Sequence, residues 1–87
     1  MEEKLLAMSV QELKDTMVKI DREGEKLCET TNAYIDKFNE VKEDLPQERI
    51  DKAYRLIAEA RSRLETLARA RALSKLILER KYGVFIM

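Results

Sequence analysis

The side chains with the most capacity for chemistry are cations in the second half of this 87-residue chain. They are Arg61, Arg63, Arg69, Arg71 and Lys75. Arginine and lysine bind phosphates, so this group would suit contacts with nucleic acid. On a helix with about 100° between residues, however, these cations encircle the axis, and no aromatic residues lie between them to stack on bases. Binding of RNA or other nucleic acid by a dimer of helical hairpins is therefore an alternative function.

The residues that most often perform catalysis or bind metals are scarce. The sequence has no histidine, and so lacks the commonest general base and metal ligand. Its one cysteine, Cys28, lies beside an apolar seam and is expected to pack as a small buried hydrophobe. The glycines, Gly24 and Gly83, stand alone and form no phosphate-binding loop. We therefore expect no enzyme activity, no cofactor, no metal and no small-molecule substrate.

One enzyme family has a local resemblance to the chain. Residues 12–21 (ELKDTMVKID) and 46–49 (PQER) resemble the small all-helical chorismate mutases. The resemblance covers about a third of the chain, and it implies long helices, a dimer and an activity of chorismate-mutase type. That family grips substrate carboxylates with arginines, whereas Lys14 and Thr31 occupy the nearest positions here. Because of this departure no catalytic residue is carried over, and the activity is a remote alternative.

The first half of the chain has a heptad repeat of apolar residues. Apolar steps of four and three residues alternate over more than five repeats, which is typical of a helix that packs along a seam. This pattern predicts helix one at about residues 4–44, although Ser9 and Glu12 fit a capping box at which a helix could start. A break near Gly24–Asn32 would instead give a three-helix bundle. The seam residues expected to hold the hairpin or an oligomer are Leu13, Met17, Ile20, Leu27, Tyr34 and Phe38.

Pro46 marks the expected boundary between two helices, because proline fits the first turn of a helix and disrupts later turns. We expect a turn at about 44–46 and helix two at about 46–82, followed by an apolar tail at 83–87. A short connection makes the helices antiparallel neighbours, here within a single domain of residues 1–87. In helix two the expected seam residues are Ile57, Leu64 and Leu67.

Charge and apolar surface both indicate association. The net charge is zero, but residues 1–45 carry 7 basic and 12 acidic side chains while residues 46–87 carry 10 and 5, so the two halves should attract each other. A two-helix hairpin of this length cannot cover all its apolar residues, which predicts a homodimeric four-helix bundle or a complex with another protein. The expected partner-binding residues are Leu73, Leu76, Tyr82, Val84, Phe85, Ile86 and Met87.

The whole sequence predicts an all-α, coiled-coil-like hairpin that works by binding. We expect a non-enzymatic adaptor, small chaperone, inhibitor or regulator, or structural subunit. The small size, the absence of catalytic groups and the surplus apolar surface would also suit a small phage or viral accessory protein. The N-terminal segment MEEKLLAM is too short and too acidic for a signal peptide. No apolar run approaches the ~18 residues that span a bilayer. These features predict a cytoplasmic protein of a reducing compartment with no membrane partner.

Overall fold

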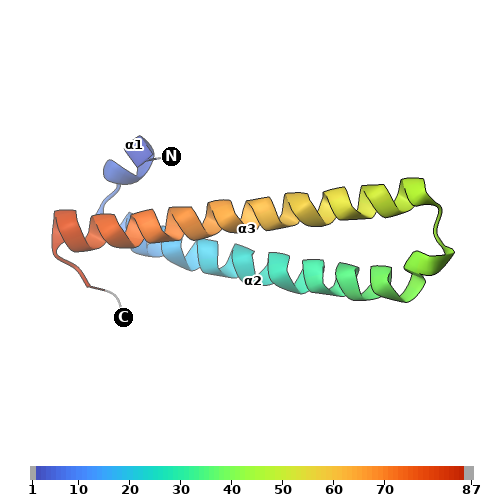
Figure 1. Cartoon of the computed structure of the whole chain (residues 1–87). Helices are drawn as coiled ribbons and strands as arrows, with labels where there is room; N and C mark the ends of the chain where they lie inside the picture. Colours follow the sequence, from blue (N-terminus) through green and yellow to red (C-terminus); the bar gives the residue numbers. More distant parts are fainter. Residues whose placement is uncertain (1, 86–87) are drawn as a thin grey trace.

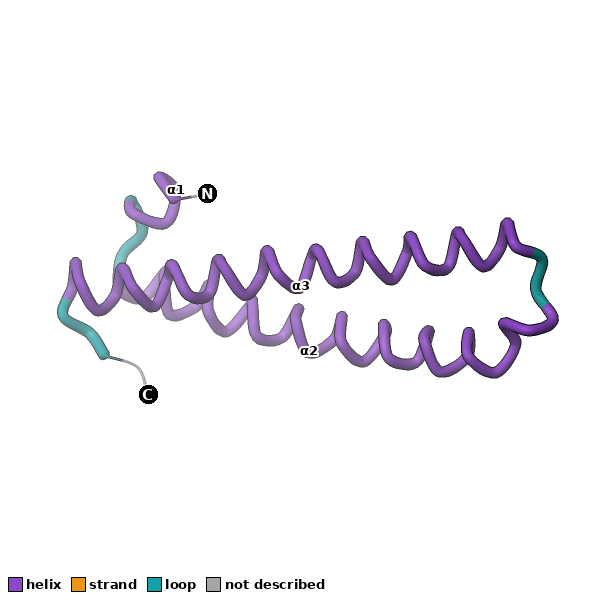
Figure 2. The backbone as a smooth tube through the Cα atoms, viewed as in Figure 1, coloured by secondary structure: helices purple, strands orange, loops and turns teal. Residues whose placement is uncertain are grey.

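The computed structural model describes residues 2–85, and these residues form an extended helical hairpin. The elements are α1 (Glu2–Leu6), α2 (Val10–Val41), a 3-10 turn η1 (Lys42–Asp44) and α3 (Gln47–Tyr82). Helices α2 and α3 run antiparallel over their whole lengths, and α1 lies against α3 at the end opposite the turn (Figures 1 and 2). The radius of gyration is 17.5 Å, whereas a compact domain of this length would have about 12 Å. The all-α hairpin predicted from the sequence is therefore confirmed.

The prediction of one helix from about residue 4 to residue 44 is wrong at its N-terminal end. The chain leaves the helix after Leu6 and enters α2 only at Val10. Ser9 is the reason: its backbone is extended, its Oγ accepts from the Glu12 N–H, and its own N–H donates to Glu12 Oε1, both at 3.2 Å. This capping box satisfies the free amides at the start of α2, so it favours a helix start over a helix interior.

The alternative three-helix arrangement with a break near Gly24–Asn32 does not occur, because α2 is continuous through this region. The Thr30 Oγ1 donates to the Lys26 carbonyl at 2.9 Å, and Thr31 is buried in the α2–α3 contact. The hydroxyl of Thr30 therefore bonds within the helix instead of ending it.

Both ends of α3 have the residues expected of helix termini. Pro46 precedes the first turn with an extended backbone, and Gly83 adopts the left-handed conformation with φ of 65° after the last turn. The Gly83 N–H donates to the Leu78 carbonyl, and the Val84 N–H donates to the same carbonyl at 2.8 Å. This bond turns the chain back, so that Val84 packs against the buried residues at this end.

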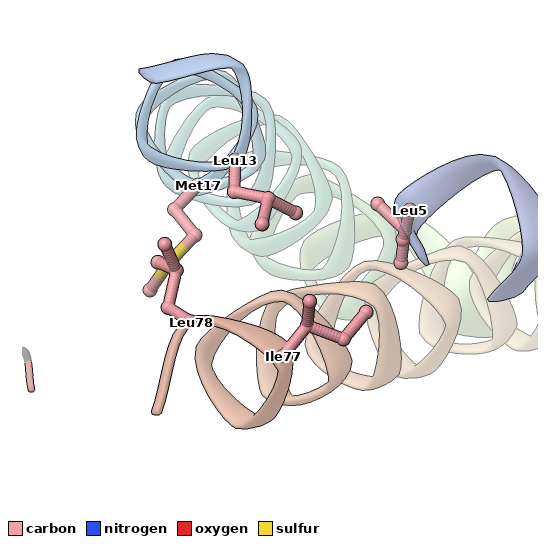
Figure 3. Packing of buried hydrophobic residues seen from close by; sticks show 5 residues of the cluster. All are labelled: Leu5, Leu13, Met17, Ile77 and Leu78. Atoms are coloured by element: carbon pink, nitrogen blue, oxygen red, sulfur yellow. The ribbon is translucent and has the colours of Figure 1, made fainter. Parts of the chain in front are cut away.

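The best-buried part of the molecule lies where α1, α2 and α3 meet. We call it the terminal cluster, and it consists of Leu5, Leu13, Met17, Ile77 and Leu78 (Figure 3). Two polar contacts hold the end of α1 and the linker of residues 7–9 over α3: Lys81 Nζ donates to the Leu6 carbonyl at 2.6 Å, and the Tyr82 hydroxyl donates to the Met8 carbonyl at 2.7 Å. One end of the hairpin is thus built from three helices.

Candidate helix-docking surface

One row of heptad positions in α2 passes from the core to the surface along the hairpin. Its members are spaced by seven residues: Leu13, Ile20, Leu27, Tyr34 and Val41. The exposed fraction is 0% at Leu13 and 9% at Ile20, and rises to 41% at both Tyr34 and Val41. In the adjacent row, which faces α3, Met17, Thr31 and Phe38 are buried and Gly24 is partly buried. The change along the first row therefore reflects a missing neighbour, and not a separation of α2 from α3.

The same change occurs on α3. Ile77 is buried and points towards Leu5 of α1 (Figure 3). Two and three heptads earlier lie Arg63 and Leu56, and Leu56 is 44% exposed. Residues spaced by heptads stay on one face of a helix that packs along a seam. The face that α1 covers at the terminal cluster is therefore uncovered towards the turn.

Two grooves follow this uncovered face, which we call the open face. The turn groove encloses about 740 Å³, and its lining residues are Tyr34, Lys37, Phe38, Val41, Leu45, Pro46, Glu48, Arg49, Lys52, Ala53 and Leu56. The middle groove encloses about 550 Å³, and its lining residues are Glu23, Lys26, Leu27, Thr30, Arg63, Thr66 and Leu67. Both grooves draw residues from α2 and from α3, so a helix seated in them would contact both.

A third groove lies on the other side of the hairpin near the turn. This back groove encloses about 440 Å³ between Ile35 and Asn39 of α2 and Tyr54 and Ala58 of α3. The exposed Tyr54 ring packs edge-on against Phe38, with 5.5 Å between ring centroids. Its charged lining residues are one cation, Arg61, and one anion, Glu65, in contrast to the open face.

The predicted seam residues divide between the core and the open face. Leu13, Met17, Ile20, Phe38 and Ile57 are buried, and Leu27, Leu64 and Leu67 are partly buried. Tyr34 alone among them is exposed, and it lines the turn groove. Val41 of the same groove was not among the expected partner-binding residues, whereas Leu56 belongs to the apolar excess that a two-helix hairpin was expected to leave uncovered. Their signal in the sequence is their heptad spacing from Leu13 and Ile77.

The predicted partner-binding residues near the C-terminus have different environments. Leu73 and Val84 pack against the terminal cluster, and Tyr82 bonds to the linker. Leu76 is 41% exposed on α3, and Phe85 is 76% exposed. Ile86 and Met87 lie outside the described residues.

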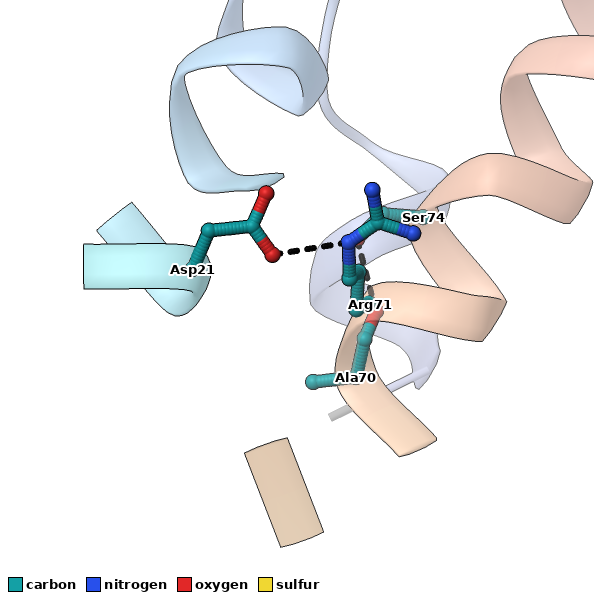
Figure 4. A network of polar contacts seen from close by, with 4 residues as sticks. All are labelled: Asp21, Ala70, Arg71 and Ser74. Atoms are coloured by element: carbon teal, nitrogen blue, oxygen red, sulfur yellow. Dashed lines mark hydrogen bonds and ion pairs between the residues drawn. The ribbon is translucent and has the colours of Figure 1, made fainter. Parts of the chain in front are cut away.

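The predicted nucleic-acid contacts are not gathered on one surface. Arg71 Nε bonds to Asp21 Oδ1 at 2.8 Å and so joins α3 to α2, while nearby Ser74 Oγ donates to the Ala70 carbonyl (Figure 4). Arg61 lines the back groove and Arg63 the middle groove, on opposite sides of the hairpin. Arg69 is exposed, and Lys75 is partly buried. The Arg71–Asp21 ion pair is a direct contact between the basic second half and the acidic first half of the chain.

The expectation that Cys28 is buried is wrong, because the structure exposes this residue. Its position lies next to the seam, but within residues 2–85 the main packing on α2 comes from α3, so a residue beside that contact remains in solvent. Among the described residues, no three His, Cys, Asp or Glu side chains are placed together as metal ligands would be.

Comparisons with known proteins do not assign the chain to a family. No protein-family model, no curated protein sequence and no solved structure matches it. Within residues 2–85, none of the helices has the length and apolar character needed to cross a membrane.

Proposed function

We propose that this chain is a non-enzymatic protein-binding module whose open face takes up a helix from a partner. The observation that carries the proposal is the exposure of Tyr34, Val41 and Leu56 at heptad positions that are buried wherever a third helix is present. Exposed apolar residues that form a continuous groove mark interaction sites more often than scattered ones do. An adaptor, a small chaperone, an inhibitor and a structural subunit all act by such binding.

The accessible surface supports the proposal. It amounts to 6962 Å², whereas a monomeric globular protein of 10.2 kDa exposes about 5,300 Å². The excess of about 1,600 Å² is roughly twice the ~800 Å² that each partner buries in a protein–protein interface of standard size. The chain therefore has enough unburied surface for one stable complex.

A second copy of the chain is the first partner to test. The sequence predicts a homodimeric four-helix bundle, in which each hairpin supplies the two helices that cover the other. Sedimentation at tens of micromolar measures this association directly. A dimer supports self-assembly, and a monomer leaves a different protein as the partner.

Binding of a partner helix is tested with a peptide whose flanking positions are uncharged. The probe is a synthetic amphipathic peptide with leucine at a and d positions and glutamine at the flanking positions, titrated into isotope-labelled chain. We expect the largest NMR shifts at Leu27, Tyr34, Val41 and Leu56. Leu56→Ser should weaken binding about tenfold, because about 1.4 kcal/mol of apolar contact is lost.

The chain supplies a matched control for this experiment. Leu76 lies in the same helix with a similar exposed fraction, 41% against 44% for Leu56, but outside both grooves of the open face. Leu76→Ser should therefore leave the affinity unchanged. Equal losses of peptide affinity in the two variants would overturn the proposed function. So would the absence of NMR shifts at the open face both on addition of the peptide and on self-association.

A further inference from the structure

We propose that the helix bound at the open face is an acidic amphipathic helix of another protein. This inference rests on the proposed function and adds the chemical character of the partner. It starts from the charged residues that line the two grooves. The chain as a whole has a net charge of zero, so a local excess of one sign needs an explanation.

Cations outnumber anions at the open face by five to two. The cations are Lys37, Arg49 and Lys52 in the turn groove and Lys26 and Arg63 in the middle groove. The anions are Glu48 and Glu23, one in each groove. All seven side chains are exposed. The back groove, with one cation and one anion, shows that this excess belongs to the open face and not to every groove of the hairpin.

The cations stand on both sides of the apolar row. Lys26 and Lys37 come from α2, and Arg49, Lys52 and Arg63 come from α3. A helix that lies between α2 and α3 over Tyr34 and Leu56 would therefore have basic side chains along both of its edges. Such an arrangement selects glutamate and aspartate at the positions that flank the apolar stripe of the partner.

A second copy of the chain fits this face less well. Pairing of two identical open faces would bring ten cations together with four anions, and like charges across an interface oppose association. The apolar residues of the two grooves also favour a protein helix over nucleic acid as the partner. Tyr34, Val41 and Leu56 would gain nothing from a phosphate backbone, whereas leucines of an amphipathic helix would cover them.

The length of the uncovered row indicates the size of the partner segment. From Leu27 to Val41 the row extends for about 21 Å at the rise of an α-helix. A partner helix of about four turns would cover it. Shorter segments would leave Leu27 or Val41 exposed.

The inference is tested with three peptides that share one helical frame and one leucine row. Their flanking positions carry glutamate, glutamine or lysine, and their affinities for the full-length chain are measured by calorimetry. We expect the glutamate peptide to bind at least about tenfold more tightly than the lysine peptide. This difference should shrink as salt rises to about 1 M, because salt screens exposed charges.

Two double variants with equal changes in net charge locate the effect. Lys37→Glu with Lys52→Glu removes two cations of the turn groove and should abolish or reverse the preference for the glutamate peptide. Lys14→Glu with Arg69→Glu changes exposed cations outside the three grooves and should preserve the preference. Circular dichroism and urea unfolding verify that each variant keeps the helical fold.

The outcomes separate this inference from the proposed function. If the glutamine peptide binds at the open face but the glutamate peptide binds no better, the face docks helices and the acidic preference is wrong. If no peptide binds and the chain does not self-associate, both proposals fail. If a dimer formed through Tyr34 and Leu56 excludes the glutamate peptide, a second copy of the chain is the partner and the inference is overturned. If an RNA oligonucleotide binds these residues and the peptide does not, nucleic acid is the partner and the inference is likewise overturned.

Discussion

At the terminal end of the hairpin Leu13 and Leu78 are completely buried, whereas at the turn end Tyr34 and Leu56 keep about two fifths of their surface in solvent. The two ends have the same two helices and the same heptad pattern. They differ in the presence of α1, which lies on one face of α2 and α3 at the terminal end only (Figure 1). A heptad pattern thus says which residues can be buried, and the number of neighbouring helices decides which of them are.

The covering helix is itself dependent on the hairpin. A helix of five residues is far below the length that is stable in water without tertiary contacts. Leu5 in the terminal cluster and the bonds from Lys81 and Tyr82 to the end of α1 and the linker supply those contacts. The terminal end shows that one short helix on this face is enough to complete a core. The turn end lacks such a helix, and the same role is left for a partner.

The largest expected effect is the difference in stability loss between two leucine variants, one at each end of the hairpin. Leu78→Ala should lower the free energy of unfolding by about 2–5 kcal/mol, because it leaves a cavity in a fully buried site. Leu56→Ala should lower it by about 0.5 kcal/mol or less, since much of this side chain already contacts water. Urea unfolding followed by circular dichroism measures both values, at a concentration where the chain is monomeric.

This pair of variants can contradict the proposed difference in packing between the two ends. Similar losses in Leu78→Ala and Leu56→Ala would mean that the turn end is as well packed as the terminal end in solution. Tyr34 and Val41 would then be covered in the free chain, and the open face would not exist as described.

The long elements could be predicted from the sequence because their signals are local. The heptad steps of α2, Pro46 before α3 and Gly83 after it each act within a few residues, and each has its expected result. The fold-back of α1 could not be predicted with the same certainty, since Leu6 continues the apolar spacing while the capping box at Ser9 interrupts the helix. Two local signals competed there, and the hydrogen bonds of the cap prevailed.

The open face was harder to predict than the helices. Tyr34 and Leu27 were expected as seam residues, but their exposure depends on whether α1 reaches them, which is a property of the tertiary fold. The apolar tail led to the expectation of a partner site at the C-terminal end. In the structure Val84 of this tail packs against the terminal cluster of the same chain. Cys28 is exposed for the same reason, because a position beside the seam is buried only if a third helix covers it.

A smaller effect is expected from the cap that allows α1 to fold back. Ser9→Ala removes the acceptor for the Glu12 N–H and should lower the free energy of unfolding by about 1 kcal/mol. Hydrogen exchange should increase most at the Glu12 amide and its neighbours in the first turn of α2, because the Glu12 N–H loses its acceptor. Ser62→Ala is the matched control: Ser62 is exposed inside α3, so alanine there should have no effect or stabilise slightly. A loss in Ser62→Ala as large as that in Ser9→Ala would argue against the capping role.

A small change of the opposite sign is expected between the two ends, at Gly24. This glycine lies inside α2 with ordinary helical backbone, and a Cβ placed on it would meet no atom within 4 Å. Gly24→Ala should therefore raise the free energy of unfolding by about 0.5–1 kcal/mol, because alanine has less backbone freedom to lose. The other glycine gives the opposite sign: Gly83 has φ of 65°, so Gly83→Ala should destabilise the chain by about 1 kcal/mol. Thermal unfolding of the two variants measures both signs in one experiment. If Gly24→Ala destabilises the chain instead, α2 needs flexibility at its centre, and the two ends of the hairpin are coupled through that point.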